Sequence, residues 1–202
     1  KIKQSDELKS SLISICDFII KDLNRTKFEE GFCFSYSPIT QDCTYNATIL
    51  GTEILAKVSS ITGKDFLPLI SDSLDFVLHH QHDDGHWNYS INKETGIERK
   101  QIDFHQGYIL ESLEEITNII PKFRNKCEEH IKQGINFYKS QFNLEGRSYY
   151  RLPRIWPAEI HTQAQAIIFF SNYRTSEEET NLSEKILSWT INNTKPSALK
   201  TL

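Results

Sequence analysis

An all-α fold is predicted for this chain of 202 residues. Apolar residues recur at helical spacing from one end to the other, and the connections between consecutive apolar segments are short. A unit of roughly 55 to 60 residues also recurs along the sequence, which is a period typical of arrays of supersecondary units. Segments with the two-residue alternation of strands are scarce.

The apolar period and its punctuation predict helices over residues 8–23, 45–61, 66–80, 103–119, 123–142, 159–173 and 183–193. Gly63 is a stop signal for the second helix, and Pro121 ends the fourth. Because the connections at residues 62–65 and 121–122 are short, consecutive helices are expected to form antiparallel hairpins.

Each repeat has an aromatic-rich loop, a rather apolar helix, a tight turn and a more charged helix. The loop segments are Phe34-Ser35-Tyr36-Ser37, Trp87-Asn88-Tyr89-Ser90 and Ser148-Tyr149-Tyr150-Arg151. The helices that follow open with Tyr45-Asn46-Ala47, Asp103-Phe104-His105 and Glu159-Ile160-His161. These helices carry small or apolar residues on most faces and are expected to form a buried inner layer, whereas their partners are amphipathic and form an outer layer.

Alternating inner and outer helices in repeated hairpins close into an α/α toroid, with all inner-helix N-termini at one end. We expect about three to four hairpins, the C-terminal part of a larger ring. The sequence contains no methionine and opens inside a helical pattern. A single toroid domain over residues 1–202, truncated at its N-terminus, is therefore predicted.

Composition limits the classes of partner. Acidic residues outnumber basic ones by 27 to 23, and no basic stripe is present, so nucleic acid is not an expected partner. The sequence has neither the apolar segment of a signal peptide nor a run long enough to cross a bilayer. The four cysteines form no CxxC pair, and Cys33 and Cys43 are interpreted as inert packing residues. A cytoplasmic protein without membrane insertion is expected.

An acid-x-His pattern opens two of the inner helices, as Asp103 with His105 and as Glu159 with His161. In a ring, both pairs would face one pocket, where two carboxylates and two imidazoles suit general acid–base chemistry. Asp103 could equally be a helix cap. A histidine in the first turn is favoured in its neutral form, which serves as a base, by the positive end of the helix dipole. We predict these four residues as catalytic.

Aromatic and polar side chains crowd the same loops and helix starts. Tryptophan and tyrosine rings stack on the apolar faces of sugars, and arginine binds carboxylates or phosphates, although most aromatic residues serve packing. The predicted substrate-binding residues are Tyr36, Tyr45, Asn46, His86, Trp87, Tyr89, Arg99, Gln106, Tyr150, Arg154 and Trp156. No ligand spacing supports a metal site, no glycine-rich phosphate loop or GxSxG elbow occurs, and no cofactor is expected.

The segments YSP, YNATILGTEILA, DDGHWNYS, RKQIDFHQGYILESL and WPAEIHTQAQAI resemble a family of bacterial surface-polysaccharide biosynthesis proteins of the α/α-toroid type, whose loci encode capsule and exopolysaccharide enzymes. The similarity runs from about Cys16 to Asn172. Architectural relatives include six-hairpin glycosidases, uronyl epimerases and polysaccharide lyases, an analogy of fold alone. The resemblance implies a setting in polysaccharide synthesis, with an oligosaccharide as ligand.

Three functions are compatible with these observations. The first is a carbohydrate-active enzyme of the hydrolase, epimerase or lyase type, with Asp103 and Glu159 as acid and base. The second is a non-catalytic helical-repeat scaffold or glycan-binding module in a polysaccharide-biosynthesis complex, in which the acid-x-His pairs are caps. The third is a terpene-cyclase-like toroid for a lipid-linked sugar, which the charged, hydroxyl-rich loops disfavour.

Overall fold

The computed structural model describes residues 6–173 and 176–194. Most of these residues are helical. The helices are α1 (Asp6–Lys21), α2 (Tyr45–Thr62), α3 (Leu67–His79), α4 (His105–Ile119), the 3-10 turn η1 (Pro121–Phe123), α5 (Arg124–Ser140), α6 (Ile160–Asn172) and α7 (Glu177–Asn193). Short strands lie between them, as β1 (Arg25–Lys27), β2 (Phe32–Phe34), β3 (Cys43–Thr44), β4 (Ser90–Ile91) and β5 (Glu98–Arg99). The all-α class is thus confirmed, and no helix of the described residues is long and apolar enough to span a membrane.

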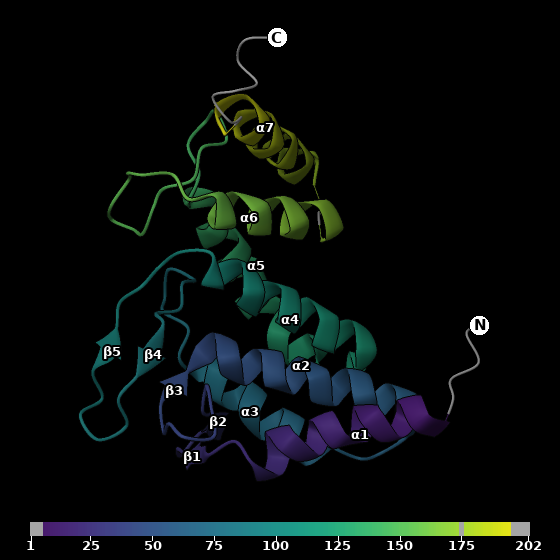
Figure 1. Cartoon of the computed structure of the whole chain (residues 1–202). Helices are drawn as coiled ribbons and strands as arrows, with labels where there is room; N and C mark the ends of the chain where they lie inside the picture. The colour runs from purple at the N-terminus through teal and green to yellow at the C-terminus, as the bar shows by residue number, and fades with distance from the viewer. Residues whose placement is uncertain (1–5, 174–175, 195–202) are drawn as a thin grey trace.

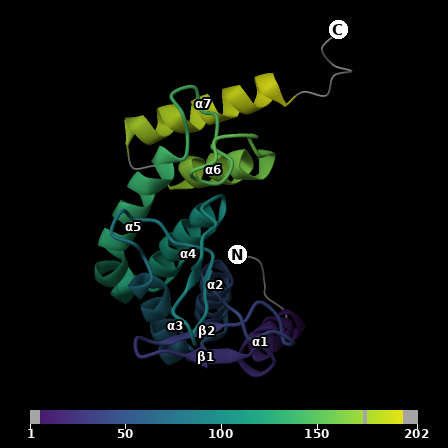
Figure 2. The same cartoon turned by 90° about the vertical axis from the view of Figure 1, so that its left-hand side faces the viewer.

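Three antiparallel helix hairpins make up most of the described chain. Helix α2 packs on α3, α4 on α5, and α6 on α7. The first helices of the hairpins also pack in sequence, α2 against α4 and α4 against α6, so they form one layer (Figure 1). Seen from the side, the hairpins follow an open arc, with α3 and α5 outside α2 and α4 (Figure 2). Within residues 6–173 and 176–194 the helices form an open layer of paired helices, and no closed ring is present in this part of the chain.

The loops that lead into α2, α4 and α6 all lie at one end of this layer, on the left in Figure 1. Backbone pairing joins each loop to the next. Strand β3 pairs antiparallel with β4, and β4 pairs with β5. Further along, Ile102 forms an isolated bridge with Leu152, whose N–H donates to the Ile102 carbonyl at 3.2 Å. A continuous rim of loops therefore runs across the three hairpins.

Each inner helix holds its own loop through one side chain near the helix start. The Thr48 hydroxyl accepts from the Phe34 N–H at 3.2 Å, and its one proton lies within reach of two carbonyls, that of Thr44 at 3.0 Å and that of Phe34 at 3.3 Å. The Gln106 amide accepts from the Trp87 N–H at 2.9 Å and donates to the Trp87 carbonyl at 2.7 Å. We call such a pair of hydrogen bonds, made by one helix side chain to the backbone of a loop, a clasp.

A third clasp occurs on α6, where the Gln163 amide accepts from the Ser148 N–H at 3.1 Å and donates to the Gly146 carbonyl at 3.2 Å. All three clasping side chains are buried, so their polar atoms need partners, and loop backbone supplies them. Because the clasped residues lie at equivalent places in the loop segments compared above, the clasps support the three-fold repeat.

Helix ends follow local chemistry. Gly63 ends α2 in the left-handed conformation at φ 75°, and its N–H donates to the Ser59 carbonyl, as the stop signal predicts. Helix α7 begins at Glu177, six residues before the predicted start at Ser183. The Ser176 side chain accepts from the Glu179 N–H, and three acids fill the first turn. The apolar period does not reach this Ser N-cap, because no apolar residue marks the first turn.

Close packing between α4 and α5 depends on glycine. A Cβ on Gly134 of α5 would lie 2.6 Å from Leu110 Cδ2 and 3.0 Å from Trp87 Cζ3. Gly51 of α2 is different, because a Cβ there would meet Phe34 Cδ2 at 3.5 Å, an ordinary contact. The same residue type therefore has a steric role on one helix and none on the other.

We predict opposite effects for alanine at these two helical glycines. Gly134→Ala should lower the free energy of unfolding by about 1–3 kcal/mol, because the methyl group overlaps buried side chains. Gly51→Ala should be neutral or raise it by up to about 1 kcal/mol, because alanine favours helix and space is available. Urea unfolding followed by circular dichroism measures both, and equal effects would contradict the packing described here.

Candidate functional site

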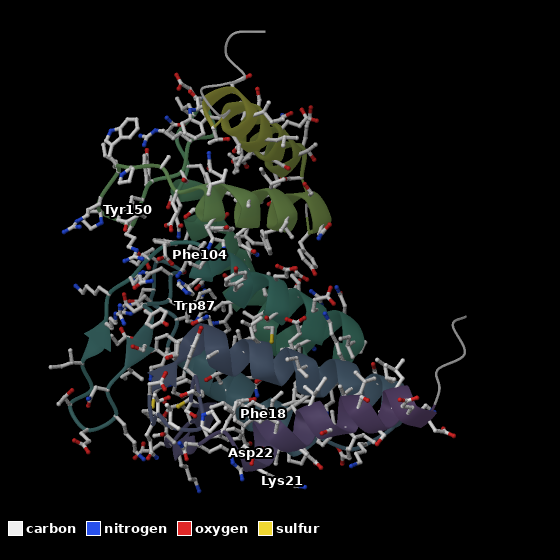
Figure 3. The ribbon with its side chains drawn as sticks, in the orientation of Figure 1. Phe18, Lys21, Asp22, Trp87, Phe104 and Tyr150 are labelled. Carbon is white, nitrogen blue, oxygen red and sulfur yellow. The ribbon has the colours of Figure 1, made fainter. Side chains whose placement is uncertain are left out.

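Two acid-x-His motifs lie at the starts of two neighbouring helices, as the sequence predicts. Asp103 and His105 stand at the start of α4, and Glu159 and His161 at the start of α6. Because α4 and α6 pack side by side, both motifs lie at the loop-bearing end of the inner layer (Figure 1). Phe104, labelled in Figure 3, marks this end of α4.

The Asp103 carboxylate is the centre of the first motif. It is fully buried, and its Oδ1 is hydrogen-bonded to Nδ1 of His105 and accepts from the His105 N–H at 3.2 Å. Its Oδ2 accepts from Gln101 Nε2 at 3.0 Å and lies 3.3 Å from Arg151 Nε. Asp103 therefore accepts from the first N–H of the helix and also orients the imidazole.

Asp103 is held in its charged form. Burial works against ionisation, but the hydrogen bonds from the ring and the N–H of His105, together with the Gln101 amide, hold the pKa of Asp103 below its ordinary value of 3.8. A sealed carboxylate with a low pKa does not donate a proton near neutral pH. The burial of Asp103 and its bonds to His105 favour an orienting role over that of a general acid.

An aromatic stack joins the two predicted histidines. The Phe104 ring stacks on His105 with 4.2 Å between centroids and on His161 with 3.9 Å. His161 Nε2 also hydrogen-bonds the Tyr108 hydroxyl at 2.7 Å. The structure thus brings His105 and His161 to one place, although they come from different repeats.

Glu159 does not share a cavity with Asp103. It lines a separate cavity of about 350 Å³ together with Trp156, Gln163 and Trp189, on the side of α6 that faces α7. Its Oε2 is buried and has no hydrogen-bond partner within the described residues. The expectation that the two carboxylates face one pocket as an acid–base pair is therefore wrong, because Asp103 is sealed and Glu159 lies elsewhere.

A larger cavity of about 740 Å³ opens between the loop that leads into α4 and the loop that leads into α6. It brings together three predicted residues, His86, Tyr150 and Arg154. Basic side chains dominate its charge. The full lining is His82, Asp84, His86, Asn88, Lys100, Ile102, Phe137, Tyr150, Arg151, Leu152, Pro153 and Arg154.

Arg151 connects this cavity to the Asp103–His105 pair. Its guanidinium lines the cavity, lies 5.2 Å from the centre of the Tyr150 ring, and places Nε beside Asp103. The side chain of Arg151 remains 39% exposed. A ligand in the cavity can therefore touch the same side chain that contacts the buried carboxylate.

One cluster at this cavity was not found from the sequence. Glu98 Oε2 lies 2.7 Å from His82 Nε2 and accepts from Asn88 Nδ2 at 2.7 Å, while Glu98 Oε1 accepts from the Tyr45 hydroxyl. Burial opposes ionisation, yet these hydrogen bonds hold the pKa of Glu98 below its ordinary value. Glu98 sits beyond the β4–β5 turn, so no local pattern relates it to the other members; an acid within a polar loop is the sole signal.

Four predicted substrate-binding residues are buried in packing positions. Trp87 has 0% exposure, and its Nε1 donates to the Val77 carbonyl, so its ring is unavailable to a ligand (Figure 3). Tyr45 is also fully buried, Gln106 serves the clasp on Trp87, and Asn46 is 7% exposed. The prediction that Trp87 stacks on a sugar is wrong, because its ring, the largest aromatic ring of the loop, is packed in the core.

Other predicted residues are accessible but lie outside the cavity. Tyr36 is 66% exposed, and Trp156 is 63% exposed with the Arg147 guanidinium 3.9 Å from its ring. Arg99 lies 4.9 Å from the Tyr89 ring, whose edge meets His105. Tyr89 therefore lies directly beside the His105 imidazole, with Arg99 over the Tyr89 ring.

Comparisons with known proteins add no assignment. No protein-family model matches the chain, and no curated protein is significantly similar to it. The resemblance to surface-polysaccharide biosynthesis proteins therefore stays a prediction. In residues 6–173 and 176–194, no group of three or more histidine, cysteine or acidic side chains has the geometry to hold a metal ion.

Replacing Asp103 tests the charged state of the buried carboxylate. Asp103→Asn should lower the free energy of unfolding at neutral pH by about 2 kcal/mol, because charge-assisted hydrogen bonds to a buried group are lost. Since the folded-state pKa lies below 3.8, the wild-type advantage is fully present above the unfolded-state pKa and is lost as pH falls through the folded-state value.

Urea unfolding at pH 7 and at about pH 3 measures this difference. The difference in free energy of unfolding between wild type and Asp103→Asn should be smaller at the lower pH. Asp83→Asn is the matched control, because Asp83 is exposed in the same loop region and should give a gap near zero at both values. If the difference in free energy of unfolding between wild type and Asp103→Asn is the same at both pH values, the lowered pKa of Asp103 is contradicted.

Proposed function

We propose that this chain is part of a carbohydrate-active enzyme of surface-polysaccharide biosynthesis or modification, in which His105 transfers a proton at an anionic saccharide. The proposal rests on one observation above all, which is that Arg151 joins the Asp103–His105 pair to a cavity of about 740 Å³ with basic walls. In this view the three hairpins are an arc of an α/α toroid, and the rim of loops is its mouth.

The chemistry of His105 follows from the side of the ring that Asp103 occupies. A carboxylate bonded to Nδ1 favours the proton on that nitrogen, which leaves the lone pair on Nε2. Nε2 is then the basic atom, and its ring is 12% exposed beside Tyr89 and Tyr108. This is the arrangement of an oriented general base, with Asp103 stabilising the imidazolium that forms.

The cavity supplies the features that bind an anionic sugar. Lys100 and Arg154 come from two different loops and have no acidic partner among the described residues, so their charges are available to a carboxylate or phosphate. Tyr150 offers a ring to the apolar face of a sugar. A volume of about 740 Å³ lies in the range of small-molecule sites.

Among the reaction types considered, proton abstraction next to a carboxylate is favoured over glycosidic hydrolysis. Hydrolysis in most glycosidases needs two carboxylates flanking one bond. Asp103 is sealed from solvent, and Glu159 lines another cavity. An oriented imidazole with nearby guanidinium groups instead suits removal of a proton whose acidity rises when the adjacent carboxylate is neutralised, as in an epimerase or a lyase.

A second candidate function is a non-catalytic module in a biosynthetic complex. It is favoured by the apolar residues that α2 leaves exposed, because Leu50, Ile54 and Ile61 follow one another at helical spacing with exposures of 37%, 37% and 36%. Under this function Asp103 caps the helix and His105 is its hydrogen-bond partner. The protein then has no turnover, and replacing His105 affects stability alone.

We predict that His105→Ala lowers turnover of the substrate by about 10²–10⁴-fold, the usual contribution of a general base, while ligand affinity changes little. The chain with all its hairpins is first screened by thermal shift against uronic-acid, amino-sugar and neutral oligosaccharides, since a ligand that binds the folded state raises the melting temperature. Turnover of any uronic-acid ligand is then followed by NMR in D₂O, which detects both exchange at the carbon beside the carboxylate and new alkene protons.

Two further variants distinguish ligand binding in the cavity from proton transfer by His105. Arg154→Ala should weaken the thermal shift because a cavity cation is lost, whereas His79→Ala, at an exposed histidine on α3, should change neither shift nor turnover. A uronic-acid ligand that binds but gives the same turnover with His105→Ala would remove His105 from the chemistry. The absence of a shift with every saccharide class would favour the module.

A further inference from the structure

Two of the four cysteines meet at the small strands before α2. Cys33 lies on β2 and Cys43 on β3, two strands that are in contact, and the two buried thiols interact with one another. Sulfur atoms, drawn in yellow, lie among these strands in Figure 3. The sequence interpretation of both residues as inert packing is incomplete, because nine intervening residues separate them along the chain and hide their proximity.

The contact makes the two thiols unequal. The hydrogen bond from Cys33 lowers the pKa of Cys43, and the same bond together with burial raises the pKa of Cys33. Among nearby charges, Lys93 favours the Cys43 thiolate and Asp42 opposes it. Cys43 is thus the better nucleophile of the pair, since the thiolate is the reactive form.

Cys43 also lies at the wall of a cavity, whereas Cys33 does not. This cavity has a volume of about 620 Å³ and is formed by β1, the start of β3 and the β4–β5 turn. Three cations line it, Arg25, Lys27 and Lys93, with Asp42 and Glu94 as the acids. Its charge favours an anionic ligand, and its size suits a small molecule.

The other two cysteines provide an internal reference. All four cysteines are buried, Cys43 with 3% exposure and the other three with 0%. Cys16 on α1 and Cys127 on α5 have no thiol partner among the described residues, and burial raises the pKa of both, to about 11 for Cys127. Neither lines the cavities described here. They have the environment of unreactive structural thiols.

We infer that Cys33 and Cys43 form a reversible dithiol–disulfide pair, in which Cys43 reacts first with a small anionic disulfide, of the glutathione disulfide type, that enters the cationic cavity. The Cys43 thiolate attacks one sulfur of the ligand, forming a mixed disulfide and releasing one thiolate. Cys33 then attacks the Cys43 sulfur, loses its proton to the medium, and releases the second thiolate. Two protein thiols are oxidised, and the ligand is reduced to two thiols.

The bond would tie β2 to β3 on either side of the loop that carries Tyr36. This loop precedes α2 and is part of the rim, so oxidation would restrain one side of the rim. The inference does not depend on the proposed carbohydrate function, because the cavity, residues and readout are all separate from His105 and Arg151.

The test uses the reduced full chain incubated with oxidised glutathione, quenched in acid and alkylated under denaturing conditions. Residues 28–57 contain no internal lysine or arginine, so one tryptic peptide holds both Cys33 and Cys43. We expect this peptide to lack both alkyl groups and to be lighter by two hydrogens, while Cys16 and Cys127 are alkylated in full. Chymotryptic cleavage after Phe34 and Tyr36 should yield two peptides joined by the disulfide.

Single variants establish the order of reaction. Cys33→Ser should accumulate the mixed disulfide with glutathione on Cys43, because the resolving thiol is absent, whereas Cys43→Ser should leave Cys33 unmodified. Both substitutions conserve size, and circular dichroism verifies that the variants fold. Full alkylation of both cysteines in the wild-type peptide, under conditions that oxidise a reference dithiol, would overturn the inference, as would an adduct on Cys33 in Cys43→Ser.

A matched pair of reagents tests the cavity. Cystamine is a dicationic disulfide and glutathione disulfide is anionic, so the cationic wall should make the anionic reagent react faster at low ionic strength. The preference should shrink in about 1 M salt, where screening acts over roughly 3 Å. Lys93→Gln should reduce it as well. Faster reaction with cystamine at low salt would overturn the assignment of the ligand class.

Discussion

The clasp between an inner helix and the backbone of its own loop is the interaction on which the rest of the structure depends. Loops carry polar backbone groups that must be satisfied where they are buried. Thr48, Gln106 and Gln163 meet this need near the starts of the three inner helices. Each clasp fixes the loop against the helix start, and the rim, the cavity and the Asp103–His105 pair are all built on that attachment.

Asp103 extends the attachment from one repeat to the next. Its buried charge holds the first turn of α4 through the His105 N–H and approaches Arg151 on the following loop. A buried charge without partners is strongly unfavourable, so loop and helix start have to stay together. The same geometry that stabilises the rim therefore orients the imidazole and supplies a guanidinium to the cavity wall.

Helix positions were predictable because they depend on local signals, namely the apolar period, Gly63 and Pro121. The parallel placement of the acid-x-His motifs followed from the repeat. What the sequence could not provide was the direction of side chains. Trp87 and Tyr89 are two residues apart in one loop, yet Trp87 fills the core while Tyr89 borders His105. Contacts across loops were equally hidden, as for Glu98 with Tyr45 and Cys33 with Cys43.

Because the clasps bind main-chain atoms of the loops, they place little demand on the loop's own side chains. Only the helix must keep a hydroxyl or an amide of suitable length, and the loop residue can be Phe34, Trp87 or Ser148 in the three hairpins. The clasps therefore tolerate loop residues as different as a phenylalanine, a tryptophan and a serine. A rim of this kind can acquire new ligand specificities one hairpin at a time.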